Sequence, residues 1–222
     1  MSGGTRCRKI FSRSKEIIFM NDIQLTDEEL NNKVHELAEE FAGSNDEGTD
    51  NSELQDVVNS MGEVIGSLPR GVIWDNELQG QTRVVNVFVV DQEGKVMLPV
   101  RSMEKRYLPG GYDFSCGENL KSGEEYLDAA IRGLREELNI EGEQPRELGS
   151  FSPDREKGTF CFGKVYLIEV GDKSEITKFN PDEVERLEWR SKEEILEMLE
   201  SEPEKFKRDY EGIFRMAFGL EK

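Results

Sequence analysis

Residues 117–140, GENLKSGEEYLDAAIRGLREELNI, decide the expected fold because they join helix signals to acidic side chains at helical spacing. Ser122 followed by Glu125 is the S-x-x-E pattern of a capping box. Asn139 follows the last apolar turn, where a residue that tolerates the left-handed conformation often ends a helix. The spacing predicts a helix over about residues 123–138, with an apolar stripe of Leu127, Ala130, Ile131, Leu134 and Leu138.

The polar face of this helix carries two adjacent carboxylates, Glu136 and Glu137, with Arg132 one turn before Glu136. Adjacent carboxylates repel each other, and a hard cation such as Mg²⁺, which prefers carboxylate oxygen, relieves that repulsion. The alternative is a solvated acidic face with an Arg132–Glu136 ion pair, which would stabilise the helix by only ~0.2–0.5 kcal/mol. The helix pattern by itself leaves both interpretations open.

The stretch resembles the box of the Nudix superfamily, G-x5-E-x7-R-E-U-x-E-E-x-G-U, where U is a bulky aliphatic residue. The positions that match in register are Glu124, Arg132, Leu134, Glu136, Glu137 and Ile140. Three positions depart from the box: Glu118 stands at its first Gly, Gly133 at the Glu after the Arg, and Asn139 at the late Gly. Gly133 is the serious departure, because in the family that Glu binds metal or serves as a base.

The resemblance extends over about residues 66–218. Residues 84–102, VVNVFVVDQEGKVMLPVRS, predict a β-hairpin that turns at 91–95, which is the usual lead-in to a Nudix box. Residues 109–119, PGGYDFSCGEN, and the later Asp-Glu-Val with Trp189 resemble the branch that contains type 1 isopentenyl-diphosphate isomerases and their hydrolase-like relatives.

Isomerase activity itself is the less favoured alternative. In that branch the reaction uses a Cys and a Glu around a metal that several histidines help to hold. Cys116 stands where the catalytic Cys would, but His35 is the one histidine of the chain. Residues 158–166, where the paired glutamates would fall, contain no acid. Cys116 is therefore expected to be a small buried residue.

The resemblance implies the Nudix α/β/α sandwich, an α/β fold with a mixed sheet between helices. It also implies a hydrolase that cleaves a diphosphate linkage in a nucleoside diphosphate-like or other small phosphorylated substrate, with Mg²⁺ or Mn²⁺ activating a water. The residues that would hold the metal are Glu136 and Glu137. The candidate catalytic residues are Glu124, Arg132 and Glu183, and the candidate substrate-binding residues are Arg101 and Gly117.

The missing carboxylate at Gly133 keeps a second class of function open. A Nudix-fold module could keep the pocket and a weakened metal site, and bind a diphosphate compound without turnover. Glu118 or Glu183 could otherwise substitute for the absent Glu. A third alternative is a protein-interaction domain that uses the N-terminal segment.

The composition restricts the partners and the compartment. The net charge is -18, with 47 Asp and Glu against 29 Lys and Arg, which argues against non-specific binding to nucleic acid or anionic membranes. The three cysteines are scattered, so no disulfide framework is indicated and a reducing cytoplasm fits. No apolar run approaches the ~18 residues of a membrane span. The oligomeric state is left open, with a homodimer as one alternative.

Three parts are expected along the chain: a basic or disordered tail (1–25), a helical acidic extension (26–63) with a linker at 43–52, and a Nudix domain (64–222). A true start at Met20, or a targeting peptide before it, are alternatives for the tail.

Further elements are predicted from capping and strand patterns. Thr26 with Glu29 predicts the cap of a first helix, and Ser52 that of a second one bearing Leu54, Val57, Val58 and Met61. Strands are expected at 72–78, 160–170, 175–179 and around 187–189, with Ser191 capping the helix that follows.

Overall fold

The computed structural model describes residues 25–41, 52–105, 107–142, 144–171, 176 and 179–220. Its main sheet has six strands, in the order β6-β7-β3-β4-β8, with β5 paired to β3 beside this path. These strands are β3 (Arg83–Asp91), β4 (Val96–Arg101), β5 (Cys116–Asn119), β6 (Arg146–Phe151), β7 (Phe162–Val170) and β8 (Val184–Arg190). β3 runs parallel to β7, whereas the other pairs are antiparallel, so the sheet is mixed as expected.

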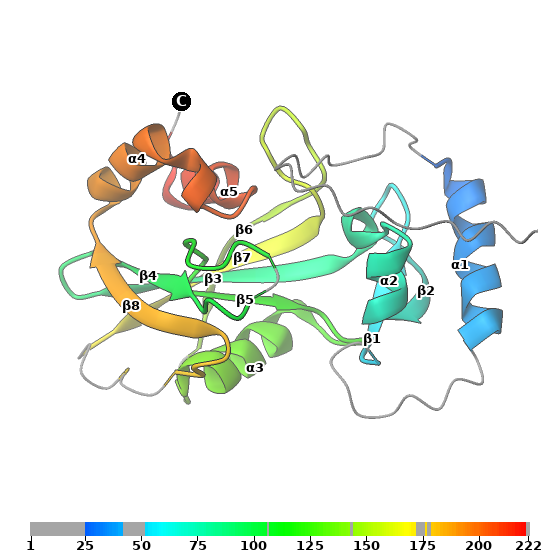
Figure 1. The fold of residues 1–222 in the computed structure, drawn as a ribbon, viewed down its shortest axis with the longest axis horizontal. Helices are drawn as coiled ribbons and strands as arrows, with labels where there is room; N and C mark the ends of the chain where they lie inside the picture. Colours follow the sequence, from blue (N-terminus) through cyan, green and yellow to red (C-terminus); the bar gives the residue numbers. More distant parts are fainter. Residues whose placement is uncertain are drawn as a thin grey trace, which may run out of the picture.

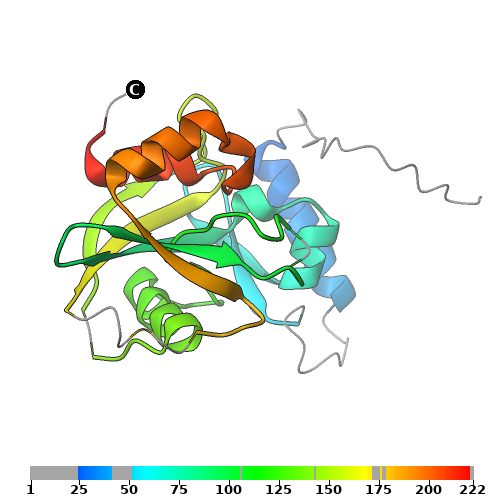
Figure 2. The same cartoon turned by 60° about the vertical axis from the view of Figure 1, so that its left-hand side comes forward.

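Helices cover both faces of this sheet (Figures 1 and 2). One face packs on α3 (Tyr126–Leu138), and the other on α4 (Lys192–Ser201) and α5 (Tyr210–Phe218), with the short helix η3 (Pro203–Lys205) between them. β3 serves both cores because successive side chains of a strand point to opposite faces: Val85 and Val87 face α3, and Phe88 faces α5. The predicted α/β/α sandwich is therefore confirmed.

The sheet is split beside β3. β5 pairs with its first half, from Val84 to Val87, whereas β4 joins it at Val90. Ser115 closes the gap between them: the backbone N–H of Val89 donates to its Oγ over 3.0 Å, and that hydroxyl donates to the carbonyl of Met97 over 2.6 Å. The residues that follow Ser115 therefore enter the sheet as β5, next to α3, the helix that carries the Nudix-like box.

The N-terminal part contains α1 (Asp27–Phe41), β1 (Leu54–Val58), β2 (Val64–Pro69) and α2 (Arg70–Asp75), with the short helix η1 (Gln79–Gln81) after it. The capping box of α1 is confirmed, since the Thr26 N–H donates to Glu29 Oε2 over 2.9 Å and the Glu29 N–H to Thr26 Oγ1 over 3.3 Å. α1 buries Leu30 and Val34 against β1, β2 and α2, so a helix does precede the sheet.

Two predictions in this region are wrong. The expected second helix from Ser52 is the hairpin β1–β2, because Asn59 and Gly62 build a turn: the Asn59 side chain accepts from the N–H groups of Met61 and Glu63, and Gly62 is left-handed at φ 80°. The expected strand at 72–78 is α2, whose Val72 and Ile73 are buried under α1. Tertiary burial overrides the β-propensity of both residues.

The box helix departs from its prediction at the start and in its stripe. It begins at Tyr126 after an N-cap Glu125 without a side-chain cap, while the Ser122 hydroxyl lies 2.8 Å from that of Ser67. Leu127 and Ile131 are exposed, because the face on the sheet is centred one residue away, on Ala129, Ala130, Gly133, Leu134 and Leu138. Asn139 ends the helix in the left-handed region at φ 53°, as predicted.

The remaining strand and helix predictions are largely confirmed. The hairpin turns between Val90 and Val96, β7 and β8 lie where expected, and Ser191 forms a capping box with Glu194 at the start of α4. The tail before residue 25, most of the linker at 43–52 and most of the expected strand at 175–179 lie outside the described residues. The division at 63/64 stays a prediction. In the described part of the chain, no helix combines the length and apolarity needed to cross a bilayer.

Candidate functional site

Gly133 lies in the middle of α3, where the helix meets β5. A Cβ atom on Gly133 would lie 2.5 Å from Glu118 Cγ and 2.6 Å from Cys116 Sγ, far inside van der Waals contact. Glu118 is the residue that replaces the first box glycine. Its side chain therefore takes the space that a side chain at position 133 would need.

Arg132 joins the carboxylates of the box. Its Nε donates to Glu124 Oε1 over 2.8 Å and its Nη2 to Glu124 Oε2 over 3.0 Å. Its Nη1 lies 3.0 Å from Glu118 Oε2 and 3.5 Å from Glu136 Oε2. Burial would lower the pKa of Arg132, but the hydrogen bonds to Glu124 and the charge of Glu118 raise it overall. The predicted orienting role of Arg132 fits these contacts.

Glu124 serves as an anchor of the loop before α3. Both of its oxygens accept from Arg132, and Oε2 also accepts from the Lys121 N–H over 2.9 Å. Burial raises the pKa of Glu124, yet these hydrogen bonds bring it below its usual value. Both oxygens of Glu124 therefore hold the loop and Arg132 in place. These contacts are consistent with the supporting role expected for Glu124.

The same loop is fastened to β1 through Asp56, which is 4% exposed. Asp56 Oδ2 accepts from the Gly123 N–H over 3.0 Å and from Arg83 Nη2 over 2.7 Å, and its Oδ1 accepts from the Ser67 hydroxyl. The Ser122 N–H also donates to the carbonyl of Leu54 over 2.8 Å. The N-terminal hairpin therefore holds the loop that leads into the box helix, a role that the helical interpretation of this segment could not show.

Glu137 on α3 and Glu118 on β5 both lie near the thiol of Cys116. The Cys116 thiol lies 3.8 Å from Glu137 Oε1 and beside the position of the Gly133 Cβ. Burial and the negative charges of Glu118 and Asp113 raise the pKa of Glu137 well above that of an ordinary glutamate. Burial also raises the pKa of Glu118, and Arg132 offsets only part of that rise. This pair carries an excess of negative charge that a cation would relieve.

A buried polar cluster lies on the α5 side of the split sheet. Asp113 forms ion pairs with Arg101 Nη1 and, over 2.9 Å, with Lys207 Nζ. Burial raises the pKa of Asp113, but Lys207 and Arg101 bring it below its ordinary value. Arg101 also donates to the carbonyl of Tyr107 over 2.9 and 3.1 Å. Arg101 thus forms its ion pair with Asp113 inside the protein, and its expected contact with substrate remains a prediction.

Gly117 lies beside this cluster. A Cβ on Gly117 would be 3.3 Å from Asn86 Oδ1 and 3.8 Å from Lys207 Nζ, so glycine keeps the backbone close to both groups. Asn86 is 4% exposed, and its Nδ2 has no hydrogen-bond partner among the described residues. Neither Asn86 nor Lys207 stands in a motif, so the sequence offered no signal for them.

Glu183 lies in the loop before β8. Its carboxylate forms an ion pair with Lys105, and its charge contributes to the raised pKa of Glu137 after burial, Glu118 and Asp113. The Asn180 N–H donates to the Glu137 carbonyl over 3.1 Å, which fastens this loop to the end of α3. The loop of Glu183 is therefore attached to the box helix, and a catalytic role of Glu183 stays a prediction.

Carboxylate oxygens make this donor set chemically suited to a hard divalent cation. After burial, the charge of Glu118 contributes to the raised pKa of Glu137, and Glu136 shares Arg132 Nη1 with Glu118. Within the described ranges, no group of three or more Asp, Glu, His or Cys side chains is already gathered around one point. Substrate phosphates and waters commonly complete such a site.

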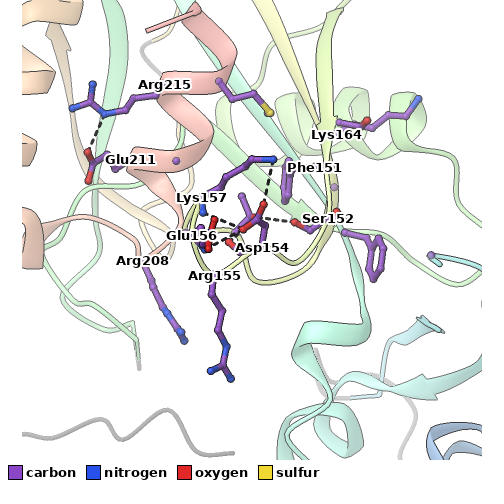
Figure 3. A pocket seen from close by; sticks show the side chains of 18 of the residues that line it. Phe151, Ser152, Asp154, Arg155, Glu156, Lys157, Lys164, Arg208, Glu211 and Arg215 are labelled. Atoms are coloured by element: carbon purple, nitrogen blue, oxygen red, sulfur yellow. Dashed lines mark hydrogen bonds and ion pairs between the residues drawn. The ribbon is translucent and has the colours of Figure 1, made fainter. Parts of the chain in front are cut away.

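A cavity of about 960 Å³ opens elsewhere, between the loop at 152–158, β7 and α5 (Figure 3). It reaches the box at Tyr126, the first residue of α3. Within it Lys157 pairs with Asp154 over 3.2 Å and Arg215 with Glu211 over 2.9 Å. Glu118 and Glu137 do not line it. We place the candidate active site at the carboxylates and not at this cavity. Acidic side chains with shifted pKa values mark a reactive site more specifically than an open space does.

Known proteins share both this fold and this site region. A family model of the NUDIX domain matches residues 80–210. A Nudix hydrolase from Deinococcus radiodurans is 36% identical over 149 residues, which is 65% of this chain and 82% of that protein. The crystal structure of protein DR0079 from Deinococcus radiodurans aligns with a TM-score of 0.67 at 33% identity, and the alignment covers 75% of this chain and 99% of that one.

These similarities, with the sandwich and its box helix, show that the chain belongs to the Nudix family. An isopentenyl-diphosphate Delta-isomerase from Pectobacterium atrosepticum is 28% identical over 144 residues, which is 62% of this chain and 79% of that protein. The expected likeness to the branch that contains these isomerases is therefore confirmed.

Proposed function

We propose that this protein is a metal-dependent Nudix hydrolase that cleaves a diphosphate linkage in a nucleoside diphosphate-like or other small phosphorylated substrate. The observation that carries the proposal is geometric: the Cys116 thiol lies 3.8 Å from Glu137 Oε1 and, together with Glu118, borders the Cβ position of Gly133, so α3 and β5 bring both carboxylates to one region. Two close carboxylates in such surroundings favour a divalent cation. The sequence similarity to a Nudix hydrolase from Deinococcus radiodurans supports the same reaction class.

The residues of this chain would divide the work as follows. Glu136 and Glu137 would hold Mg²⁺ or Mn²⁺, which when bound lowers the pKa of a water and neutralises phosphate charge. Arg132, fixed by both oxygens of Glu124, keeps the carboxylates oriented. Lys207, beside Gly117, would direct its ammonium N–H groups at phosphate oxygens.

The loop around Glu183 would complete the site from the other side. Its attachment to the carbonyl of Glu137 through Asn180 fixes the distance between the loop and the box helix. Lys105 holds the Glu183 carboxylate, so a phosphate that attracts Lys105 would release Glu183 to act as a base. The buried thiols of Cys116 and Cys161, which form no disulfide, fit a reducing cytoplasm.

The test is release of phosphate or nucleoside monophosphate from a panel of nucleoside diphosphate compounds and prenyl diphosphates, with Mg²⁺ or Mn²⁺. Wild-type turnover that disappears on metal removal and in Glu137→Gln is the expected result. The matched control is Glu147→Gln, which removes a carboxylate on the edge strand β6 that pairs with Lys164 of β7. Turnover that persists in Glu137→Gln would refute the assigned site.

A non-catalytic binding module is the second candidate, favoured by one observation: α3 carries Gly133 where the family box has a Glu. Such a module would bind a diphosphate compound with metal and leave it intact. Metal-dependent thermal stabilisation by one compound of the panel, with no product after prolonged incubation, would decide for this candidate.

A further inference from the structure

We propose that Glu118 supplies, from β5, the carboxylate that the Nudix box carries on α3 at position 133, and that it acts as a metal ligand together with Glu136 and Glu137. The inference rests on the proposed function, because it specifies the ligands of the same metal. It assigns to Glu118 a role that belongs to a helix position in the family pattern.

The first support is steric. Glu118 and Gly133 are the two positions where the chain exchanges the residues of the box, Glu for Gly and Gly for Glu. Their side-chain spaces overlap, since a Cβ at 133 would lie 2.5 Å from Glu118 Cγ. The carboxylate therefore reaches the same region between β5 and α3 from the opposite wall.

The second support is the orientation of the Glu118 carboxylate. Arg132 Nη1 engages Oε2 at 3.0 Å, whereas Oε1 lies 3.4 Å from the Cβ position of residue 133 and accepts no hydrogen bond from the described residues. Cys116 Sγ borders the same position at 2.6 Å and contacts Glu137 Oε1 at 3.8 Å. Glu118 and Glu137 thus both lie near the Cys116 thiol beside Gly133, and Glu118 has its Oε1 turned toward that position.

Other carboxylates are less suited to this role. Glu124 has both oxygens engaged by Arg132 and the Lys121 N–H, and Glu183 is held by Lys105. Glu124 and the Asn119 carbonyl bind Nε and Nη2 of Arg132, so Glu118 engages only Nη1, and it does so through Oε2 alone. The unused Oε1 of Glu118 favours metal binding.

The test exchanges the two residues back to the family pattern and measures Mn²⁺ binding by isothermal titration and by the electron paramagnetic resonance signal of the bound ion. Glu118→Gly should weaken Mn²⁺ binding about tenfold or more. Gly133→Glu should lower the Tm, because its side chain collides with that of Glu118. The double variant Glu118→Gly/Gly133→Glu should recover both the Tm and the Mn²⁺ affinity of the wild type.

Glu118→Gln keeps the shape of the side chain and removes its charge. It provides the test of Mn²⁺ binding if the glycine variants fail to fold. It should weaken Mn²⁺ binding as Glu118→Gly does, while the control Glu147→Gln should leave binding unchanged. Wild-type affinity in Glu118→Gln, with loss of binding in Glu137→Gln, would overturn this inference and leave the proposed function standing. A wild-type chain that binds no Mn²⁺ and cleaves no compound would overturn both.

Discussion

The thiol of Cys116 lies 3.8 Å from Oε1 of Glu137, inside the interface between β5 and α3. Burial and the negative charges of Glu137 and Glu118 raise the pKa of Cys116 well above that of an ordinary thiol. A thiol in this setting stays protonated at neutral pH and is a poor nucleophile. Cys116 therefore packs the site, although it stands at the position of a catalytic Cys in the isomerase branch.

Replacement of Cys116 by Ala should leave metal-dependent turnover within a few-fold of the wild type. In the native protein, iodoacetamide at pH 8 should leave Cys116 unmodified, whereas the chain unfolded in guanidinium should be alkylated there. Peptide mass spectrometry measures the difference. Rapid alkylation of native Cys116 with a parallel loss of turnover would show that the thiol takes part in the reaction.

Gly133→Ala should destabilise the protein, although Ala is favoured over Gly inside a helix by about 1 kcal/mol. The added Cβ would lie within 2.6 Å of both Glu118 Cγ and Cys116 Sγ, and relief of such overpacking typically costs about 1–3 kcal/mol. Urea unfolding measures the change.

The matched control for Gly133 is Gly149→Ala in β6, where the added Cβ meets nothing within 4 Å and little change is expected. A Gly133→Ala variant more stable than the wild type would mean that the side chains of Glu118 and Cys116 move aside at little cost in free energy. The space between α3 and β5 would then not be occupied in the way described.

Arg132→Lys should lower stability by about 2–3 kcal/mol in urea unfolding. The arginine is 12% exposed and makes a two-pronged contact with Glu124 while reaching Glu118, and a lysine ammonium cannot reproduce that fork. Arg135→Lys is the control on the same helix: this side chain is 55% exposed, and the effect should stay within about 0.5 kcal/mol. Equal effects of the two replacements would argue that Arg132 does not organise the loop.

Asp56→Asn should destabilise the protein at pH 7 by about 1–3 kcal/mol, since Asp56 accepts from Gly123, Ser67 and Arg83 in a buried position. Burial would raise the pKa of Asp56, but these hydrogen bonds bring it below its ordinary value. A carboxylate with a depressed folded pKa contributes stability above its unfolded pKa and loses it as the pH falls through the folded value.

The stability difference between wild type and Asp56→Asn should therefore shrink as the pH falls from about 5 toward 3, across the unfolded pKa of an aspartate. Urea midpoints at several pH values measure it, with the exposed Asp75→Asn as control. A difference that stays constant over this range would show that the Asp56 charge contributes nothing to the attachment of the loop.

The sequence predicted the elements whose local signals agree with their packing. The hairpin of β3 and β4 has β-branched runs around a turn, and α4 has a complete capping box at Ser191, so local preference and burial point the same way. The segments around Leu54 and Val72 failed because their apolar spacing fits helix and strand alike, and only their neighbours in the N-terminal core decide between them.

The site was predictable where it follows the helix period and not where it depends on contact between elements. Glu136, Glu137 and Arg132 share α3, so their proximity follows from spacing. The approach of Glu118 to Gly133, and of Lys207 to Asp113, joins segments that only the folded sheet brings together. No local pattern encodes those pairs.

The overlap between the side-chain spaces of Glu118 and Gly133 also restricts how this chain could have arisen from one with the usual box. Glutamate at both positions would force α3 away from β5, whereas glycine at both would fold with a small gap. Stepwise descent would thus run through a double-glycine ancestor, stable but short of one acid. A pattern search that scores each position separately would mark the present chain as degenerate, although a carboxylate side chain reaches the same region from the opposite wall.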